Sequence, residues 1–256
     1  MILDEIISNK RHEVANLKLQ LKHQKLPKER KNACDFYSAF PKGKISLIAE
    51  VKKASPSAGV IVEDFDPVDI AKTYEKAGAA AISVVTDQKY FQGEIRFLER
   101  VKLSTKIPVL RKDFIIDESQ IYESCRAGAD AILLIARILT DEQLEAFIGL
   151  TRKLKMRCLV EVHDEADTER ALKSRARIIG INNRDLDSLA VDLQTTFNLI
   201  DKFPELKKGI IISESGISSK EEVRALEKKG VSGILVGESL LKSSNIAEKI
   251  RKLMGN

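Results

Sequence analysis

The feature that most constrains the fold is a strict alternation of short apolar runs with amphipathic stretches, which begins at residue 47. The runs are rich in aliphatic residues and are bounded by turn residues, as buried strands are. They are Leu47–Val51, Ala81–Val85, Val109–Leu110, Ala131–Ile135, Cys158–Val162, Ile178–Ile181, Ile210–Ile212 and Gly233–Val236. Stretches with apolar residues at helical spacing separate and follow them: Pro67–Ala77, Ile95–Leu103, Glu118–Ala127, Asp141–Leu154, Glu165–Ser174, Leu193–Phe203, Ser219–Lys229 and Ile246–Leu253. This alternation predicts a parallel sheet.

Eight such units within about 210 residues predict an α/β fold of the (β/α)8 TIM-barrel type. An open doubly wound sheet is the alternative. It is disfavoured because no glycine-rich dinucleotide loop follows the first strand. A loose internal repeat supports closure, since Gly78, Gly128 and Gly230 stand before strands two and four units apart. Each is expected to end a helix in a left-handed conformation.

Residues 1–44 form a polar segment ahead of this alternation. One helical face of the segment is apolar and contains Ile2, Leu3, Ile6, Ile7, Val14 and Leu17. Pro27 ends the pattern, and residues 33–40 predict a second short helix. We therefore expect a single domain over residues 1–256, with an N-terminal helical extension at 1–44 and the barrel at 45–256. Because the extension directly precedes the first strand, we expect it to cover the barrel mouth.

Composition argues against several classes of protein. The net charge of +5 comes from 43 basic and 38 acidic residues that are interleaved, whereas nucleic-acid-binding proteins usually cluster basic residues. Cys34, Cys125 and Cys158 are odd in number and far apart, which predicts a reducing cytoplasm without disulfides or a metal site. The N-terminus lacks the order of a signal peptide, and no apolar run approaches the ~20 residues that span a bilayer.

Polar residues gather where the predicted strands end, which is where the active sites of barrels lie. They are Glu50 and Lys52, residues 111–114, Glu161 and His163, residues 182–185, residues 213–216 and residues 237–239. This set is too polar for a core and indicates a site. Within it, Arg111 and Asp113 are expected to alternate away from the site and to be structural, and His163 is expected to cap the next helix.

Four of these residues together indicate a functional site. Residues two apart in a strand share a face, so Glu50 and Lys52 point the same way. Glu161 lies among apolar residues, where a carboxylate must pair or change its pKa. Lys112 directly follows an apolar run. Each alone is explained by a structural ion pair or a surface charge, but their convergence at one mouth favours a functional site.

A phosphate site is predicted at the ends of the last two strands. Ser215 and Gly216 precede one helix, and Gly237 precedes a possible helical turn at Glu238–Leu241. Loops after strands 7 and 8, together with a short helix, form the usual phosphate site of barrels, where glycine lets backbone N–H groups approach. Ordinary helix capping is the alternative. Glu238 fits a phosphate site only if its side chain points outward.

Six stretches together resemble the indole-3-glycerol phosphate synthase family of tryptophan biosynthesis. They are Ile48–Gly59, Val109–Phe114, Leu159–His163, Ile179–Leu186, Ser213–Ile217 and Leu235–Ser239, in the family's order. The resemblance implies a carboxy-lyase that converts 1-(2-carboxyphenylamino)-1-deoxyribulose 5-phosphate to indole-3-glycerol phosphate, carbon dioxide and water. It implies no cofactor, no metal and a small phosphosugar substrate. The expected partners include neither nucleic acid nor a membrane, and a monomer is compatible with the sequence.

The resemblance also implies roles for individual residues. Lys112 is the general acid at the ketone oxygen, and Glu161 is the general base for dehydration. Lys52 binds the substrate carboxylate with a share in the acid role, and Glu50 orients the lysines. The other implied contacts are Asn182, Arg184 and Ser213 or Ser215 for positioning, Ser55, Ser215, Gly216, Gly237 and Glu238 for phosphate, and Phe91, Phe114, Leu133 and Leu186 for the anthranilate ring.

The chemistry of the implied reaction agrees with these roles. Ring closure needs a proton on a ketone oxygen, and a lysine near a second cation is expected to have a lowered pKa and to donate readily. Dehydration needs an acid and a base across one bond, and a buried glutamate opposite a lysine supplies that pair.

Three other functions fit the sequence less well. A phosphoribosylanthranilate isomerase would need a cysteine and an aspartate at strand ends, and no cysteine falls at such an end. A catalytically silent phosphate-binding barrel would lack Lys112 or Glu161, and both are present. A nucleic-acid-binding module would need a basic stripe with interleaved aromatic residues.

Overall fold

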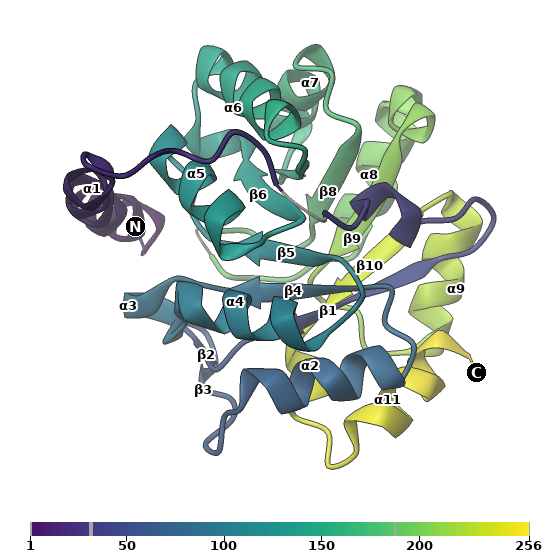
Figure 1. Cartoon of the computed structure of the whole chain (residues 1–256). Helices are drawn as coiled ribbons and strands as arrows, with labels where there is room; N and C mark the ends of the chain where they lie inside the picture. The colour runs from purple at the N-terminus through teal and green to yellow at the C-terminus, as the bar shows by residue number, and fades with distance from the viewer. Residues whose placement is uncertain (1, 31–32, 187, 256) are drawn as a thin grey trace.

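A computed structural model of the chain contains a closed barrel of parallel strands with helices around it (Figure 1). It describes residues 2–30, 33–186 and 188–255, so the expectations for residues 1, 31–32, 187 and 256 lie outside the described residues. The barrel strands are β1 (Ser46–Val51), β4 (Ala81–Val85), β5 (Val109–Lys112), β6 (Ala131–Ile135), β7 (Arg157–Val162), β8 (Ile178–Asn182), β9 (Ile210–Glu214) and β10 (Gly233–Val236). The predicted barrel is confirmed, and the open sheet is wrong, because β1 pairs in parallel with both β4 and β10.

Eight longer helices follow the strands in the predicted places. They are α2 (Pro67–Lys76), α4 (Ile95–Ser104), α5 (Glu118–Ala127), α6 (Asp141–Lys153), α7 (Glu165–Lys173), α8 (Gln194–Lys202), α9 (Lys220–Lys229) and α11 (Ile246–Met254). Most begin at a side-chain cap, as where Ser219 accepts a hydrogen bond from the N–H of Glu222. The predicted glycine ends are confirmed, since Gly78, Gly128 and Gly230 have φ of 96°, 92° and 98°.

Several short elements lie in the loops. They are the hairpin β2 (Ala54–Ser55) and β3 (Gly59–Val60), the helices α3 (Gln88–Phe91) and α10 (Glu238–Leu241), and the 3-10 turns η2 (Ala136–Ile138) and η3 (Pro204–Lys208). The extra turn predicted at residues 238–241 is therefore present as α10. The hairpin and α3 follow β1 and β4, so they stand at the end of the barrel where the strands finish.

Alternate strands fill the barrel interior in layers. Ile48, Leu110, Leu159 and Ile212 form one apolar layer inside the barrel. Below it, near the strand starts, three inner positions hold the small residues Ala81, Ala131 and Gly233. Phe36 and Phe40 occupy the space beside these small residues, and a Cβ at Gly233 would come within 2.8 Å of the Phe40 ring. The repeat seen in the sequence therefore has two structural causes: glycines end the helices, and small residues at the strand starts leave space for Phe36 and Phe40.

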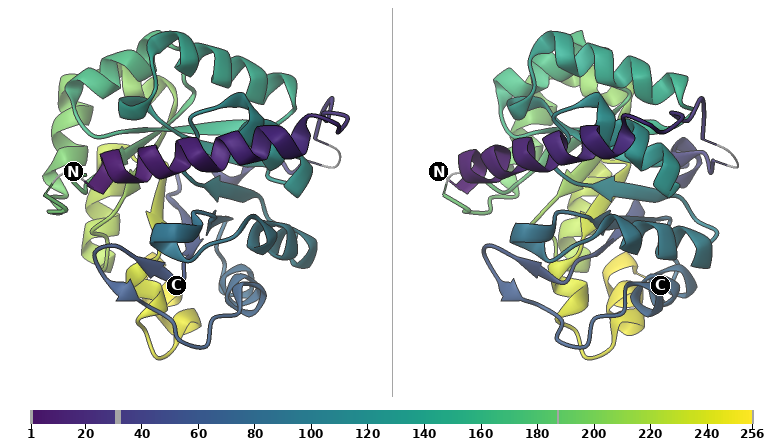
Figure 2. Two further views of the ribbon diagram at one scale, coloured as in Figure 1. Left: turned by 90° about the vertical axis from the view of Figure 1, so that its left-hand side faces the viewer. Right: turned by 60° about the vertical axis from the view of Figure 1, so that its left-hand side comes forward.

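The extension closes both ends of the barrel. Its first part is helix α1 (Ile2–Leu21), which packs beside α5 and runs across the mouth (Figure 2). Its second part is the 3-10 turn η1 (Phe36–Ala39), which plugs the opposite end with Phe36. The expectation that the extension covers the mouth therefore holds for α1 only. The second short helix predicted over residues 33–40 is this 3-10 turn.

A buried lysine joins α1 to the barrel mouth. Lys10 is only 2% exposed, and its Nζ lies 2.8 Å from Asp87 Oδ2 and 2.9 Å from Asp113 Oδ1. Asp87 follows β4 and caps α3, and Asp113 follows β5 directly. One ammonium group therefore ties the extension to two strand ends.

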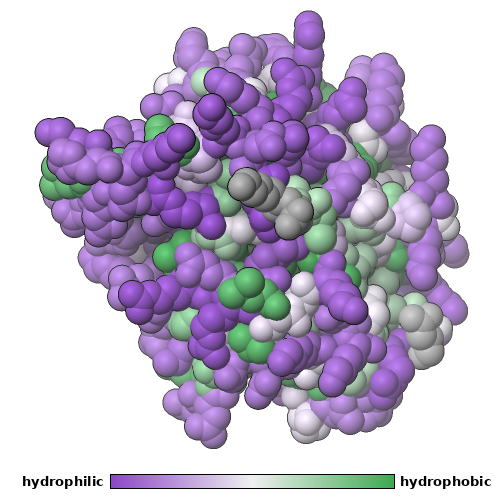
Figure 3. All heavy atoms as spheres, in the orientation of Figure 1, coloured by the Kyte–Doolittle hydropathy of each residue, from purple (hydrophilic) through white to green (hydrophobic). Residues whose placement is uncertain are grey.

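Figure 3 shows one face that is mostly hydrophilic, with small, separate hydrophobic patches. In the described residues, no helix has both the length and the apolar composition to cross a bilayer.

Replacing Lys10 by Met should loosen α1 from the barrel, because Asp87 and Asp113 would lose the cation between them. Breaking a buried ion pair costs about 3–5 kcal/mol. We expect a lower Tm together with a higher KM, because Ile6, one turn earlier, lines the cavity at the mouth. Lys18→Met is the matched control, since that side chain on the same helix is 57% exposed. A lower Tm with unchanged KM would show that α1 does not shape the site.

Candidate active site

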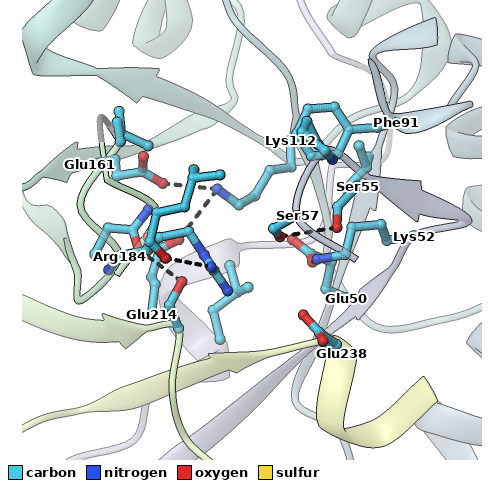
Figure 4. Close-up of a pocket in the computed structure, with 18 of the residues that line it drawn as sticks. Glu50, Lys52, Ser55, Ser57, Phe91, Lys112, Glu161, Arg184, Glu214 and Glu238 are labelled. Atoms are coloured by element: carbon cyan, nitrogen blue, oxygen red, sulfur yellow. Dashed lines mark hydrogen bonds and ion pairs between the residues drawn. The ribbon is translucent and has the colours of Figure 1, made fainter. Parts of the chain in front are cut away.

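A cavity of about 490 Å³ lies at the carboxyl ends of the barrel strands (Figure 4). Every site residue predicted from the sequence lines it except Ser213. Those that line it are Glu50, Lys52, Ser55, Phe91, Lys112, Phe114, Leu133, Glu161, Asn182, Arg184, Leu186, Ser215, Gly216, Gly237 and Glu238. The volume suits a ligand of small-molecule size.

Four charged side chains form one layer of the barrel at the floor of this cavity. Glu50, Lys112, Glu161 and Glu214 come from β1, β5, β7 and β9, which are alternate strands. The strand register places them at one level, directly above the apolar layer. Three buried carboxyl groups therefore surround one ammonium group at the floor of the cavity.

Lys112 is paired with two of these carboxyl groups. Its Nζ lies 2.8 Å from Glu161 Oε2 and 3.4 Å from Glu214 Oε2. Burial alone would lower the pKa of Lys112, but Glu161, Glu214 and Glu50 outweigh burial and raise it. The pKa of Lys112 is therefore raised, opposite to the expected lowering. The nearest groups to Lys112 are carboxyl groups, whereas the second cation, Lys52, pairs with Glu50 at 2.7 Å.

Glu161 is held ionised in the barrel interior. It is 2% exposed, and burial by itself would raise its pKa. Lys112 and His163 outweigh burial and lower the pKa of Glu161 below its usual range. Its carboxylate therefore accepts contacts from two cationic side chains.

Glu214 is a site residue to which the sequence patterns gave no role of its own, although it lies in the polar stretch at residues 213–216. It is 1% exposed, and burial, Glu161 and Glu50 together raise its pKa against the opposing effect of Lys112. Gly180 on the adjacent strand makes room for it, because a Cβ there would overlap Glu214 Oε1. The available signal was its place two residues after Ile212, which puts both side chains on the inner face of β9.

Ser213 points outward from β9, away from the barrel interior, and does not line the cavity. Its prediction as a residue of the cavity is therefore wrong. Ser213 is fully buried, accepts a hydrogen bond from Asn183 Nδ2 at 3.0 Å, and shares one with Thr196 Oγ1 at 2.8 Å. Its neighbour Glu214 points inward, because successive side chains of a strand alternate. Ser215, just past the strand, does line the cavity.

His163 does not cap the next helix, contrary to the expectation. Asp164 is the cap of α7, and the His163 ring is 2% exposed between two acidic side chains. Its Nε2 lies 3.2 Å from Glu161 Oε1, and its Nδ1 lies 3.3 Å from Asp167 Oδ2. Burial would lower the pKa of His163, but Asp167 and Glu161 raise it to about 9. Arg111 behaves as expected, since it pairs with Asp113 at 3.0 Å and does not line the cavity, whereas Asp113 does line it, contrary to the expectation.

The predicted phosphate residues lie together on one side of the cavity. Ser215 and Gly216 have φ of 68° and 80°, so the chain turns sharply where β9 ends. Ser215 Oγ donates to Asn182 Oδ1 at 2.8 Å, and the same oxygen accepts the N–H of Arg184. Glu238 pairs with Lys242, four residues later, at 2.6 Å, and both residues line the cavity, so the side chain of Glu238 does not point away from the predicted phosphate site.

An apolar wall completes the cavity. Phe91 and Phe114 have ring centroids 6.1 Å apart, and Leu133 and Leu186 line the same space. The first turns of α1 add Ile2, Leu3 and Ile6, which belong to the apolar face of the extension that was expected to cover the mouth.

The chain has a closed parallel barrel, and buried charged side chains contact one another at its mouth. These two features place the chain in the class of (β/α)8-barrel enzymes. Sequence comparison narrows this class. Residues 3–253 match the family described as indole-3-glycerol phosphate synthase, and the chain belongs to that family. This family consists of carboxy-lyases of tryptophan biosynthesis.

Individual relatives agree with this assignment. The chain is 47% identical to indole-3-glycerol phosphate synthase of Acetivibrio thermocellus, with 98% of each sequence covered. It is 47% identical to that of Caldanaerobacter subterraneus over the whole of both sequences, and 50% identical to that of Dehalococcoides mccartyi over 82% of each. A solved structure of thiamine phosphate pyrophosphorylase from Pyrococcus furiosus superposes with a TM-score of 0.62 at 15% identity, covering 83% of this chain and 95% of that one. At that identity the match shows a common fold only.

Gly237 has no room for a side chain, so a substitution there tests the predicted phosphate site. A Cβ there would lie 2.7 Å from Glu50 Oε1, whereas its φ of −129° suits any residue. Gly237→Val should therefore displace Glu50 and also block backbone approach to a phosphate, lowering kcat and weakening product binding. Gly149→Ala is the control, because a Cβ at Gly149 meets nothing within 4 Å. Unchanged product affinity would place the phosphate elsewhere.

The charge on His163 should make the free energy of unfolding depend on pH. Its pKa is about 9 in the folded protein, against 6.5 for an ordinary histidine. The folded state holds this proton more tightly, so the stabilisation is complete below pH 6.5 and is lost as the pH rises through about 9. Denaturant unfolding of the wild type and His163→Gln should show a stability difference that shrinks across this window. A constant difference would mean that the ring is uncharged.

Proposed function

We propose that the cavity converts 1-(2-carboxyphenylamino)-1-deoxyribulose 5-phosphate to indole-3-glycerol phosphate, with Lys112 as general acid and Glu161 as general base. The observation that carries the proposal is the 2.8 Å contact between Lys112 Nζ and Glu161 Oε2 inside the charged layer. Family membership supports the overall reaction. The contact supports the assignment of these two residues, because a donor and an acceptor of protons already face the same point.

The first step is ring closure. The ring carbon that bears the carboxylate attacks the ketone carbon, and Lys112 protonates the ketone oxygen as the new carbon–carbon bond forms. The raised pKa of Lys112 keeps it protonated before the substrate arrives. When the substrate carboxylate displaces Glu50 as the partner of Lys52, a second cation comes close to the reacting centre. That change lowers the pKa of Lys112 at the time when it must donate.

Loss of carbon dioxide and of water completes the product. Breaking the bond to the carboxylate leaves its electron pair in the ring, which restores the charge balance without a cofactor. Glu161 then takes a proton as the hydroxyl group leaves with a proton from a lysine. Because Glu161 is ionised and buried, it is ready to act as this base.

The remaining residues hold the substrate in place. Backbone N–H groups near Ser215, Gly216 and Gly237 bind the phosphate, helped by Ser55, which is 7% exposed at the start of the hairpin. Asn182 and Arg184 position the sugar chain. The anthranilate ring lies against the apolar wall of Phe91, Phe114, Leu133 and Leu186.

The surroundings of the cysteines favour this reaction over the isomerase alternative. Cys34, Cys125 and Cys158 are free thiols, and none of the three lines the cavity. Burial raises the pKa of Cys158 to about 12, so this thiol is a poor proton donor or acceptor near neutral pH. Free thiols also suit the reducing cytoplasm that we propose for this chain.

Two substitutions test the acid–base assignment. The purified chain is supplied with the carboxyphenylamino sugar phosphate, and indole fluorescence follows the product. Lys112→Ala and Glu161→Gln should each lower kcat about 10²–10⁴-fold, the usual contribution of a general acid or base, with little change in substrate binding. In single turnovers, Lys112→Ala should slow ring closure, whereas Glu161→Gln should slow dehydration and accumulate an intermediate.

Lys52→Ala is the comparison variant. A carboxylate contact made in the ground state supports binding, so this change should raise KM as well as lower kcat. If Lys112→Ala raised only KM and kept kcat, Lys112 could not be the acid and Lys52 would take that role. If the wild-type chain did not turn over this substrate, the proposed function itself would be wrong.

A further inference from the structure

His163 lies directly behind the proposed catalytic base without reaching the cavity. Glu161 lines the cavity, but His163 is buried and is not among the lining residues. The sequence places the two residues on either side of Val162, at the end of β7. His163 can therefore affect the reaction only through Glu161.

The contacts of Glu161 divide between its two oxygens. Oε2 faces Lys112 at 2.8 Å, and Oε1 faces His163 Nε2 at 3.2 Å. A carboxylate on a flexible side chain can rotate so that neither of its oxygens faces Lys112. A cation on the far side removes that freedom, because rotation would break both contacts.

Asp167 fixes the ring of His163 in turn. Its Oδ2 lies 3.3 Å from Nδ1 of the ring and accepts the backbone N–H of His163 at 3.2 Å. Asp167 is itself buried on α7, and Arg137 Nε of η2 lies 3.7 Å from it. The series Asp167, His163, Glu161 and Lys112 thus alternates in charge from a helix to the middle of the barrel.

We propose that His163, oriented by Asp167, is a positioning residue that holds Glu161 Oε1 so that Oε2 faces Lys112 and the substrate. The proposal rests on the proposed function, because it gives His163 a role only if Glu161 is the base. The alternative is that His163 and Glu161 form a buried ion pair that only stabilises the fold. Loss of a positioning residue lowers kcat of the folded enzyme, whereas loss of a purely stabilising pair leaves kcat unchanged.

Two substitutions of His163 separate these two roles. Leu fills the space of the ring without a donor, and Gln can place an amide N–H near the position of Nε2. The contact between Nε2 and Oε1 is an ion pair at 3.2 Å, and loss of its orienting effect in His163→Leu should lower kcat by about tenfold with little change in KM. His163→Gln should recover most of the lost kcat. Asp167→Asn, which keeps the shape but not the charge, should have a smaller effect.

Thr168→Val is the matched control for stability. Thr168 is fully buried beside Asp167, and its hydroxyl donates only to the backbone oxygen of Asp164 in the described structure. This variant should lower Tm comparably while leaving kcat unchanged. If His163→Leu also lowered only Tm, the positioning role would be overturned.

A double variant tests whether His163 acts through Glu161. In the Glu161→Gln background, His163→Leu should cause little further loss of kcat, because the group that it orients is no longer a base. The same tenfold loss in both backgrounds would overturn the proposal, since His163 would then act independently. The wild-type rate, measured in the same assay, keeps a failure of the proposed function distinct from a failure of this inference.

Discussion

The structure depends on keeping one ammonium group, Lys112, charged inside the barrel. Removing a charge from water is costly unless partners at short range replace the water. Glu161 and Glu214 contact Lys112, and Glu50 completes the layer. Two glycines make this possible, because a side chain at Gly180 or Gly237 would collide with Glu214 or Glu50. The glycines near the site therefore provide space for carboxyl groups as well as sharp turns.

The two ends of the barrel differ: one is filled by apolar side chains, and the other contains the charged residues of the site. At the strand starts, Phe36 and Phe40 fill the space left by small inner residues. At the mouth, α1 is held by the buried Lys10 and brings apolar residues to the cavity wall. The charged layer lies at the floor of this cavity, and its carboxyl side chains are largely buried. Burial strengthens each electrostatic contact in the layer.

The two-residue period of a strand is enough to direct the proposed acid and base into the barrel. Glu161 stands among apolar residues and Lys112 follows a buried run, so both side chains are expected on the inner face. The same rule applied to β9 selects Glu214, but the serines and the glycine around it indicate phosphate binding more strongly. Ser213 was expected from the family resemblance, and its outward direction follows from the alternation that puts Glu214 inside.

The sequence by itself determined the order of strands and helices, the helix ends at glycine, and the family, because each depends on local patterns or on motifs in the chain. Only the tertiary structure decided that Glu50, Lys112, Glu161 and Glu214 share one layer, that Lys112 has a raised pKa, and that His163 contacts Glu161. It also decided that the extension reaches both ends of the barrel. These properties depend on the register with which the eight strands close, since closure brings residues from distant strands to one level, and no single stretch of sequence contains that register.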